Sequence, residues 1–288
     1  MRIAVASGKG GTGKTMVSTG LAWLAGERSL PVAFADADVE EPDGHIFLGP
    51  SFSGQERCNV LVPELKVAHC SGCGACQESC AFHAVLAVHD GILLFPELCR
   101  SCGACIRACP EHVLLEVPRG IGLLRDGWAG GGGIAFHDGV LDVGEPSGVP
   151  LIEAVVRCLA GWPIGIVDCP PGTSCAAVAA VRGADLALLV TEPTPFGLHD
   201  LRLAVEMCRL LGVPPAVVAN RADIADAGPL EAYLASESLP VLARIPFSRE
   251  IAETVSRGGI PAVETPVVRD AVECILRDIL SRYPRGPS

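Results

Sequence analysis

Short apolar runs alternate with helix-like stretches along most of the chain. Residues 2–7, RIAVAS, form an apolar run that leads into a glycine-rich turn, and residues 14–27 have the character of a helix. A second apolar run, PVAFADAD at residues 31–38, ends in acidic residues. Strand, turn, helix and strand together predict a βαβ unit with parallel strands and a right-handed crossover. The pattern therefore predicts an α/β fold with a mostly parallel sheet flanked by helices.

Between residues 44 and 147 this alternation is interrupted. We interpret residues 44–65 as irregular, and the glycine-rich residues 128–133, WAGGGG, as a mobile hinge or a partner-contact loop. The segment GIAFHDGVLDVG, residues 133–144, alternates apolar and polar positions around Asp138-Gly139. Because Asp-Gly favours two-residue turns, this segment predicts a β-hairpin that turns at those residues.

From residue 148 the α/β pattern returns. The simplest interpretation is one discontinuous domain, residues 1–65 and 118–288, with a small domain of residues 66–117 inserted after its second strand. The last six residues, YPRGPS, are expected to form a frayed tail. Apolar runs predict further strands at residues 163–168, 185–191, 215–220 and 240–246.

Composition and charge exclude several classes of partner. The net charge of −11 argues against a nucleic-acid-binding protein and against electrostatic docking on anionic lipid. Arg182 and Asp185 break the longest apolar stretch, so no membrane span is expected. Residues 267–280 have apolar positions at helical spacing without a lysine-rich face, which predicts a core-packing helix. The start of the chain does not resemble a signal peptide, and we expect a cytoplasmic protein.

A phosphate-binding turn follows the first predicted strand. Its residues fit the pattern G-x-x-x-x-G-K-[ST], in which backbone N–H groups and a helix N-terminus bind phosphate oxygens. Lys14 should reach the β- and γ-phosphates of a nucleotide, and the Thr15 hydroxyl should bind Mg²⁺. The turn consists of Gly8, Lys9, Gly10, Gly11, Thr12, Gly13, Lys14 and Thr15.

Eight of the fourteen cysteines fall into two runs with the same spacing. The runs are Cys70-x-x-Cys73-x-x-Cys76-x-x-x-Cys80 and Cys99-x-x-Cys102-x-x-Cys105-x-x-x-Cys109-Pro110. This is the bacterial two-cluster ferredoxin pattern, in which the fourth cysteine of each run ligates the other [4Fe–4S] cluster. Zinc is the competing interpretation, and the repeated four-cysteine spacing favours iron–sulfur. We assign one cluster to Cys70, Cys73, Cys76 and Cys109, and the other to Cys99, Cys102, Cys105 and Cys80.

The turn KGGTGKT resembles the deviant P-loop ATPases, K-G-G-x-G-K-[ST], which include MinD, ParA, Mrp-type carriers and the nitrogenase iron protein. In that family the first lysine reaches across a dimer to the nucleotide of the partner subunit. The resemblance therefore implies that Lys9 acts within a homodimer, or a heterodimer with a related ATPase. It also places Asp36 and Asp38 in switch I, where Asp38 would orient the attacking water and Asp36 would support Mg²⁺.

The same resemblance assigns roles near the ends of later strands. Asp168 would hold Mg²⁺ through water, and Gly172 would sense the γ-phosphate. Asn220 matches the position that contacts adenine, and Pro246 and Phe247 match a second adenine-side loop.

Cys175 lies seven residues after Asp168, at the spacing of a cluster ligand in the nitrogenase iron protein. It is therefore either a metal or cofactor contact at a dimer face or a small buried hydrophobic residue.

Nearly the whole chain resembles MinD/Mrp-like P-loop ATPases that carry an inserted ferredoxin domain. The resemblance implies a Mg²⁺-dependent ATPase that couples ATP binding and hydrolysis to electron transfer toward a redox or metal-cluster partner protein. The alternative is an ATP-dependent carrier or scaffold for metal–sulfur clusters. A positioning ATPase of the MinD or ParA type is disfavoured by the eight ligand cysteines.

Overall fold

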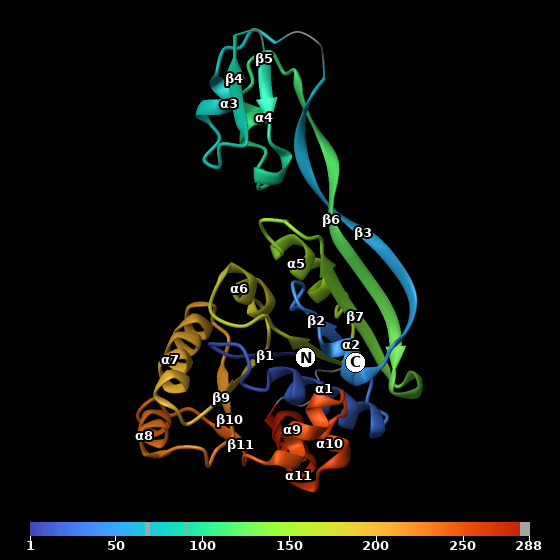
Figure 1. The fold of residues 1–288 in the computed structure, drawn as a ribbon, viewed down its shortest axis with the longest axis vertical. Coiled ribbons are helices and arrows are strands. Elements are labelled where there is room, and N and C mark those ends of the chain that lie inside the picture. The colour runs from blue at the N-terminus through green and yellow to red at the C-terminus, as the bar shows by residue number, and fades with distance from the viewer. Residues whose placement is uncertain (67–69, 90, 283–288) are drawn as a thin grey trace.

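A nine-stranded sheet forms the centre of the protein in the computed structural model, which describes residues 1–66, 70–89 and 91–282 (Figure 1). The strands from β11 to β7 run parallel, whereas β6 is antiparallel to β7 and β3 is antiparallel to β6. In sheet order the strands are β11 (Val241–Ile245), β10 (Pro215–Asn220), β9 (Leu186–Thr191), β1 (Arg2–Ala6), β8 (Ile164–Asp168), β2 (Val32–Asp36), β7 (Ile134–Leu141), β6 (Leu114–Ala129) and β3 (Ser51–Leu65).

The predicted strands of the parallel sheet are confirmed to within one or two residues at each end. Strands β2, β8 and β9 are buried at every position, as expected for parallel strands that helices cover on both faces. Nearly continuous apolar residues made these strands recognisable in the sequence, and the polar residues Asp36, Asp168 and Thr191 come only at their carboxyl ends. The mostly parallel α/β fold is therefore confirmed.

Helices cover both faces of the sheet and build one core on each. One core lies against α5, α6, α7 and α8, and the other against α1, α9, α10 and α11. The bounds are α1 (Lys14–Glu27), α2 (Gly44–Leu48), α5 (Val149–Arg157), α6 (Cys175–Val181), α7 (Pro195–Leu210), α8 (Gly228–Ser236), α9 (Arg249–Ser256), α10 (Pro261–Glu264) and α11 (Pro266–Arg282).

Helix α11 packs into the core, as the spacing of its apolar residues predicts. Val272 and Ile275 are fully buried there. None of the helices in the described part of the chain has the length and apolar composition needed to cross a bilayer. The expected frayed tail, residues 283–288, lies outside the described residues.

Strands β3 and β6 extend beyond the sheet as a two-stranded arm. Their pairing runs from Ser51 opposite Trp128 to Leu65 opposite Leu114. The interpretation of residues 44–65 as irregular is wrong, because residues 44–48 form α2 and residues 51–65 form β3. The first part of β3 is exposed on both faces, so it carries no apolar alternation from which a strand could be predicted.

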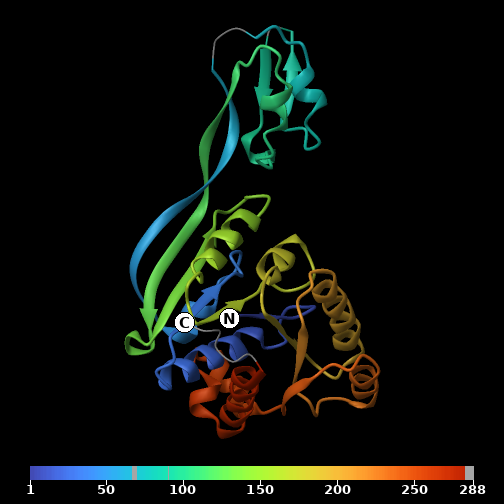
Figure 2. The same ribbon diagram turned by 180° about the vertical axis from the view of Figure 1, so that it is seen from behind.

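The arm carries a small unit at its far end (Figures 1 and 2). This unit contains two short helices next to a two-stranded antiparallel sheet. Its elements are α3 (Ala75–Glu78), β4 (Val85–Val88), β5 (Gly91–Leu94), the 3₁₀ turn η1 (Pro96–Leu98) and α4 (Ala104–Ala108). The large sheet and the small unit are therefore joined by a single continuous ladder.

The predicted hairpin at Asp138-Gly139 is wrong, because both residues lie inside β7. Asp138 is fully buried and accepts hydrogen bonds from Arg125 at 2.8 and 2.5 Å. A Cβ on Gly139 would lie 2.7 Å from Val39, so glycine here allows close packing and not a turn. The turn lies instead at η2 (Gly130–Gly132), where all three residues have positive φ. The glycine-rich segment thus connects β6 to β7.

Candidate functional site: nucleotide cavity and cysteine cavities

The carboxyl ends of the parallel strands place the predicted nucleotide residues at one edge of the sheet. Strand β1 leads into the glycine-rich turn, β2 ends at Asp36 and β8 ends at Asp168. Asp36 and Asp168 are directly opposite each other in the ladder. Ligands of open α/β sheets bind at this edge, so the topology fits the predicted site.

The glycine-rich turn needs glycine for two reasons: positive φ angles at some positions and a close backbone contact at another. Gly11 and Gly13 have φ values of 74° and 97°, in the region that favours glycine. A Cβ on Gly8 would lie 2.3 Å from the carbonyl oxygen of Asp200. Helix α1 begins at Lys14 behind Gly13, which has no side chain to cap it. The first N–H groups of the helix therefore point toward an anion-binding position.

A cavity of about 1360 Å³, partly open to solvent, lies beside this turn. It brings five residues of the turn together with Asp38, Asn220, Pro246 and Phe247. The five are Gly10, Gly11, Gly13, Lys14 and Thr15. Asn220 also donates a hydrogen bond from Nδ2 to the carbonyl oxygen of Thr12 at 2.7 Å, so it supports the turn as well as lining the cavity. Several apolar lining residues were not predicted, because nothing in their local sequence distinguishes them from core residues; Phe47, Ile251 and Val255 are among them.

Two of the three predicted acids, Asp36 and Asp168, are buried. Asp36 accepts hydrogen bonds from the backbone N–H groups of Gly44 at 2.7 Å and Asp38 at 3.1 Å. Asp168 keeps one buried oxygen, Oδ1, without a hydrogen-bond partner in the described part of the chain. Burial raises the pKa of Asp168 to about 6, while Thr15 and Lys14 oppose that shift. The unsatisfied oxygen next to Thr15 fits a Mg²⁺ site, because carboxylates and hydroxyls are ligands of this ion.

Asp38 lines the nucleotide cavity beside Lys14. Burial raises its pKa to about 6, and the nearby charge of Lys14 lowers it. The position is compatible with the role in orienting water that the family resemblance implies, which stays a prediction.

Lys9 lies away from the cavity lining and pairs within its own chain. Its Nζ atom lies 3.3 Å from Oε2 of Glu192, which is buried at the end of β9. The other oxygen of Glu192 accepts a hydrogen bond from Arg221 at 2.5 Å. Glu192 is a residue that sequence reasoning missed, because its partners are distant in the chain.

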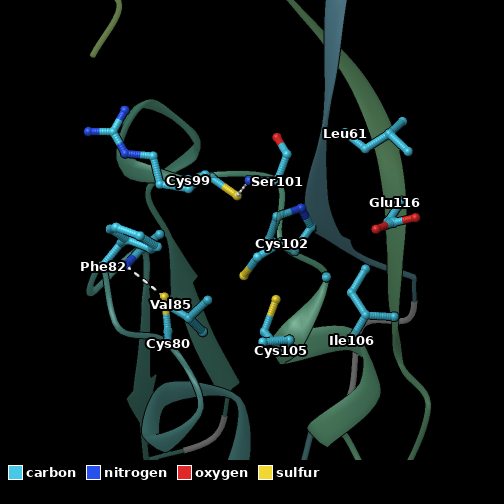
Figure 3. Close-up of a pocket in the computed structure, with 15 residues that line it drawn as sticks. Leu61, Cys80, Phe82, Val85, Cys99, Ser101, Cys102, Cys105, Ile106 and Glu116 are labelled. Carbon is cyan, nitrogen blue, oxygen red and sulfur yellow. Dashed lines mark hydrogen bonds between the residues drawn. The ribbon is translucent and has the colours of Figure 1, made fainter. Parts of the chain in front are cut away.

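The eight cysteines of the two runs line two separate cavities, and their assignment to clusters stays a prediction. One cavity is lined by Cys70, Cys73, Cys76 and Cys109. The second is lined by Cys80, Cys99, Cys102 and Cys105. In the second, the four sulfur atoms turn toward one space (Figure 3). Each run thus sends its fourth cysteine to the cavity of the other.

The backbone around the cysteines repeats between the two runs. Gly74 and Gly103 have φ values of 82° and 68°, and His83 and His112 have φ values of 53° and 52°. Sulfur atoms accept backbone hydrogen bonds in the second cavity, from Ser101 N–H to Cys99 at 3.4 Å and from Ala84 N–H to Cys80 at 3.3 Å (Figure 3). N–H groups directed at thiolate sulfur are the usual surroundings of iron–sulfur ligands.

Burial disfavours charge on the innermost thiols. Burial raises the pKa of Cys105 to about 11, and the neighbouring Cys99, Cys80 and Cys102 raise it further. The pKa of Cys76 is raised in the same way, mainly by burial and then by Cys70 and Cys109. Because four thiolates repel one another, a cation bound between them would relieve that repulsion. Both cavities therefore fit a metal or a [4Fe–4S] cluster.

Cys175 is the first residue of α6 and is exposed. The interpretation of this cysteine as a buried hydrophobic residue is therefore wrong. Whether it contacts a metal stays a prediction.

Comparison with known proteins agrees with the nucleotide site. The sequence profile of the CobQ/CobB/MinD/ParA nucleotide binding domain matches residues 3–262. The chain is 34% identical over 225 residues to protein MJ0578 of Methanocaldococcus jannaschii, covering 77% of this chain and 78% of the relative. It is 28% identical over 263 residues to MJ0579 of the same organism, covering 90% of each.

Solved structures share the fold at low identity. MinD from Pyrococcus horikoshii in complex with Mg-ADP matches with a TM-score of 0.61 and 19% identity, over 98% of this chain and 97% of that chain. MinD from Pyrococcus furiosus matches with a TM-score of 0.59 and 21% identity, over 98% of each chain. The match to the family profile covers most of the chain, and the chain therefore belongs to the CobQ/CobB/MinD/ParA nucleotide-binding family.

Proposed function

We propose that this protein is a dimeric ATPase whose nucleotide state controls electron delivery from the small unit to a partner protein. The observation that carries the proposal is a set of contacts from the acidic loop after β2, residues 37–43, to both strands of the arm. Through these contacts the nucleotide cavity would act on the strands that carry the cysteine cavities.

The first contact in this set joins the acidic loop to β7. Val39, the residue after Asp38, accepts a hydrogen bond at its carbonyl oxygen from Leu141 N–H at 2.9 Å. Its side chain packs so closely that a Cβ on Gly139 or Gly148 would lie 2.7 Å from it. A displacement of the acidic loop must therefore displace the end of β7 or break this packing.

The loop after β7 then holds both arm strands. Arg57 on β3 forms a two-pronged ion pair with Asp142, with one hydrogen bond of 3.0 Å. Arg119 on β6 forms a second one with Glu145, with hydrogen bonds of 2.5 and 2.9 Å. Bidentate arginine–carboxylate pairs fix orientation as well as distance. Movement of this loop would therefore act on the two strands that carry the small unit.

Residues at the sheet edge would bind and position the nucleotide. The N–H groups at the start of α1 and Lys14 would hold its phosphates, with Thr15 and Asp168 at the Mg²⁺ position and Asp36 bracing the loop that contains Asp38. Bound Mg²⁺ would neutralise charge on the phosphates. Asp38 would then orient the attacking water.

Lys9 would complete the site of a second subunit. Its pairing with Glu192 holds it in its own chain, and dimer formation on ATP would exchange that carboxylate for phosphate oxygens. Two distinct relatives occur in M. jannaschii, so a heterodimer of related chains is as compatible with the comparisons as a homodimer.

The thiols of the small unit would hold two [4Fe–4S] clusters, which supply one-electron transfer when bound. Cys73 and Cys102 are exposed, whereas Cys76 and Cys105 are buried. The exposed ligands mark the two points at which a redox partner could come closest to each cavity.

The test is anaerobic reduction of a partner protein that co-purifies with the chain. Reduction should be faster with Mg-ATP than with Mg-ADP or without nucleotide, and Asp38→Asn should retain ATP binding while slowing hydrolysis. Equal reduction rates in all three nucleotide conditions would contradict the proposal.

The exposure of Cys175 near the nucleotide edge supports one alternative, an ATP-dependent carrier of metal–sulfur clusters. A carrier would contain labile iron and sulfide beyond the two ferredoxin-type clusters. That excess would disappear in Cys175→Ala. Counting iron and sulfide anaerobically in both proteins distinguishes the two functions.

A further inference from the structure

Three metal-ligating side chains meet at the root of the arm, in a place that the proposed function does not use. Asp126 lies on β6, His137 lies directly opposite on β7, and Cys158 follows α5 as its C-cap. One ligand atom from each lies within 4.8 Å of the others. These residues are distinct from the eight cysteines that line the two cavities of the small unit.

His137 pairs with Asp126 through one ring nitrogen, and its other nitrogen has no partner in the described part of the chain. Its Nδ1 atom lies 2.6 Å from Oδ1 of Asp126. Its Nε2 atom is buried and has no hydrogen-bond partner among residues 1–66, 70–89 and 91–282. A buried polar atom without a partner is unfavourable, and a bound ion is one way to satisfy it.

We propose that Asp126, His137 and Cys158 bind a divalent transition-metal ion, with Zn²⁺ as the best match. Imidazole, thiolate and carboxylate together are zinc ligands, whereas Mg²⁺ and Ca²⁺ prefer oxygen alone. A carboxylate, a thiolate and a neutral imidazole carry two negative charges, which one divalent ion balances.

The geometry needs only local adjustment to close around an ion. Zinc–ligand distances of about 2.0–2.3 Å place tetrahedral donor atoms about 3.5 Å apart, so side-chain rotations could close the present spacing. The side chain of Asp126 is 40% exposed and that of His137 is 14% exposed. A water molecule could therefore complete the fourth position from the Asp126 side. The bound ion would join α5 to the β6–β7 hairpin.

The test is zinc binding by the full chain with its iron–sulfur content restored anaerobically. We expect one zinc ion per chain after dialysis, measured by elemental analysis. The zinc X-ray absorption spectrum should fit one sulfur and two or three nitrogen or oxygen neighbours. Cys158→Ser and His137→Gln should each weaken zinc binding by at least about 100-fold. Cys274→Ser, which removes an exposed thiol on α11, should have no effect.

Zinc trapped in an empty ferredoxin cavity would show four sulfur neighbours, and that result would overturn the proposal. Absence of zinc binding, or equal binding by Cys158→Ser, His137→Gln and the unaltered chain, would do so as well. Each variant must keep its full iron content and its thermal stabilisation by Mg-ADP, which shows that it has folded. Asp126→Asn provides a further variant if either of the first two fails that check.

Discussion

At the scale of a single residue, Asp168 shows how a buried carboxylate in a binding site can destabilise the folded protein. It is almost completely buried, its Oδ1 atom has no hydrogen-bond partner in the described part of the chain, and burial raises its pKa from 3.8 to about 6. A carboxyl with a raised pKa makes the folded protein more stable as the pH falls through that value. At neutral pH the ionised group therefore destabilises the nucleotide-free protein.

Asp168→Asn should stabilise the nucleotide-free protein at pH 7.5. The rise in pKa of about 2 units corresponds to at most about 3 kcal/mol, so we expect a gain of about 1–3 kcal/mol in the free energy of unfolding. The same substitution should remove the additional stabilisation that Mg²⁺ gives in the presence of ADP. Chemical denaturation with and without Mg-ADP measures both effects. Asp270→Asn, at an exposed position on α11, is the control and should change neither.

Lys9→Ala should abolish ATP-dependent dimerisation and turnover while leaving the iron content intact. The reason is that Lys9 would contribute to the partner's nucleotide and not to its own site. Sedimentation with Mg-ATP and a phosphate-release assay measure the two losses. Glu192→Gln weakens the pairing that holds Lys9 in its own chain and should leave dimerisation intact. If Lys9→Ala formed dimers with Mg-ATP at the same protein concentrations as the unaltered chain, that result would refute the assignment.

At the scale of elements, the two cysteine runs make a prediction that single substitutions cannot test. Cys80 and Cys99 line the same cavity although they belong to different runs, whereas Cys76 and Cys80 share a run but line different cavities. Cys80→Ser with Cys99→Ser should therefore retain one cluster, about four iron atoms per chain. Cys76→Ser with Cys80→Ser should damage both clusters. Anaerobic iron and sulfide counts compare two proteins with the same number of cysteines, and the reverse order would exclude the crossed assignment.

The elements also show what could be predicted from the sequence. Strands β2, β8 and β9 were predictable because strands buried on both faces need apolar residues at nearly every position. The phosphate-binding turn and the cysteine runs were predictable because their spacing follows from local chemistry. Strand β3 was not, since exposed strand residues show no alternation. Asp138-Gly139 has the composition of a turn, but its burial against Arg125 and Val39 determines its conformation.

At the scale of the whole molecule, the arm should transmit the nucleotide state to the small unit through its ion pairs. Replacing both Arg57 and Arg119 by Gln should reduce the effect of ATP on partner reduction without lowering ATP hydrolysis or iron content. The physical reason is that the loop after β7 would lose its hold on β3 and β6. Partner reduction with Mg-ATP and Mg-ADP is the measurement.

Arg244→Gln is the control, because Arg244 forms an ion pair with Glu231, between β11 and α8, that is about as exposed as the pair of Arg57 with Asp142. It should leave the ATP effect unchanged. An undiminished ATP effect in the double arm variant would show that communication takes another route.

The pairing of Leu65 with Leu114 at the end of the arm has a consequence for the history of the fold. Antiparallel strands bring both ends of the small unit side by side, so a short turn could replace the whole unit without altering any strand order. A gene encoding the sheet alone could therefore have acquired or lost the cysteine-bearing segment in one step. The ladder between β3 and β6 is the junction between the nucleotide-binding sheet and the cysteine-bearing segment.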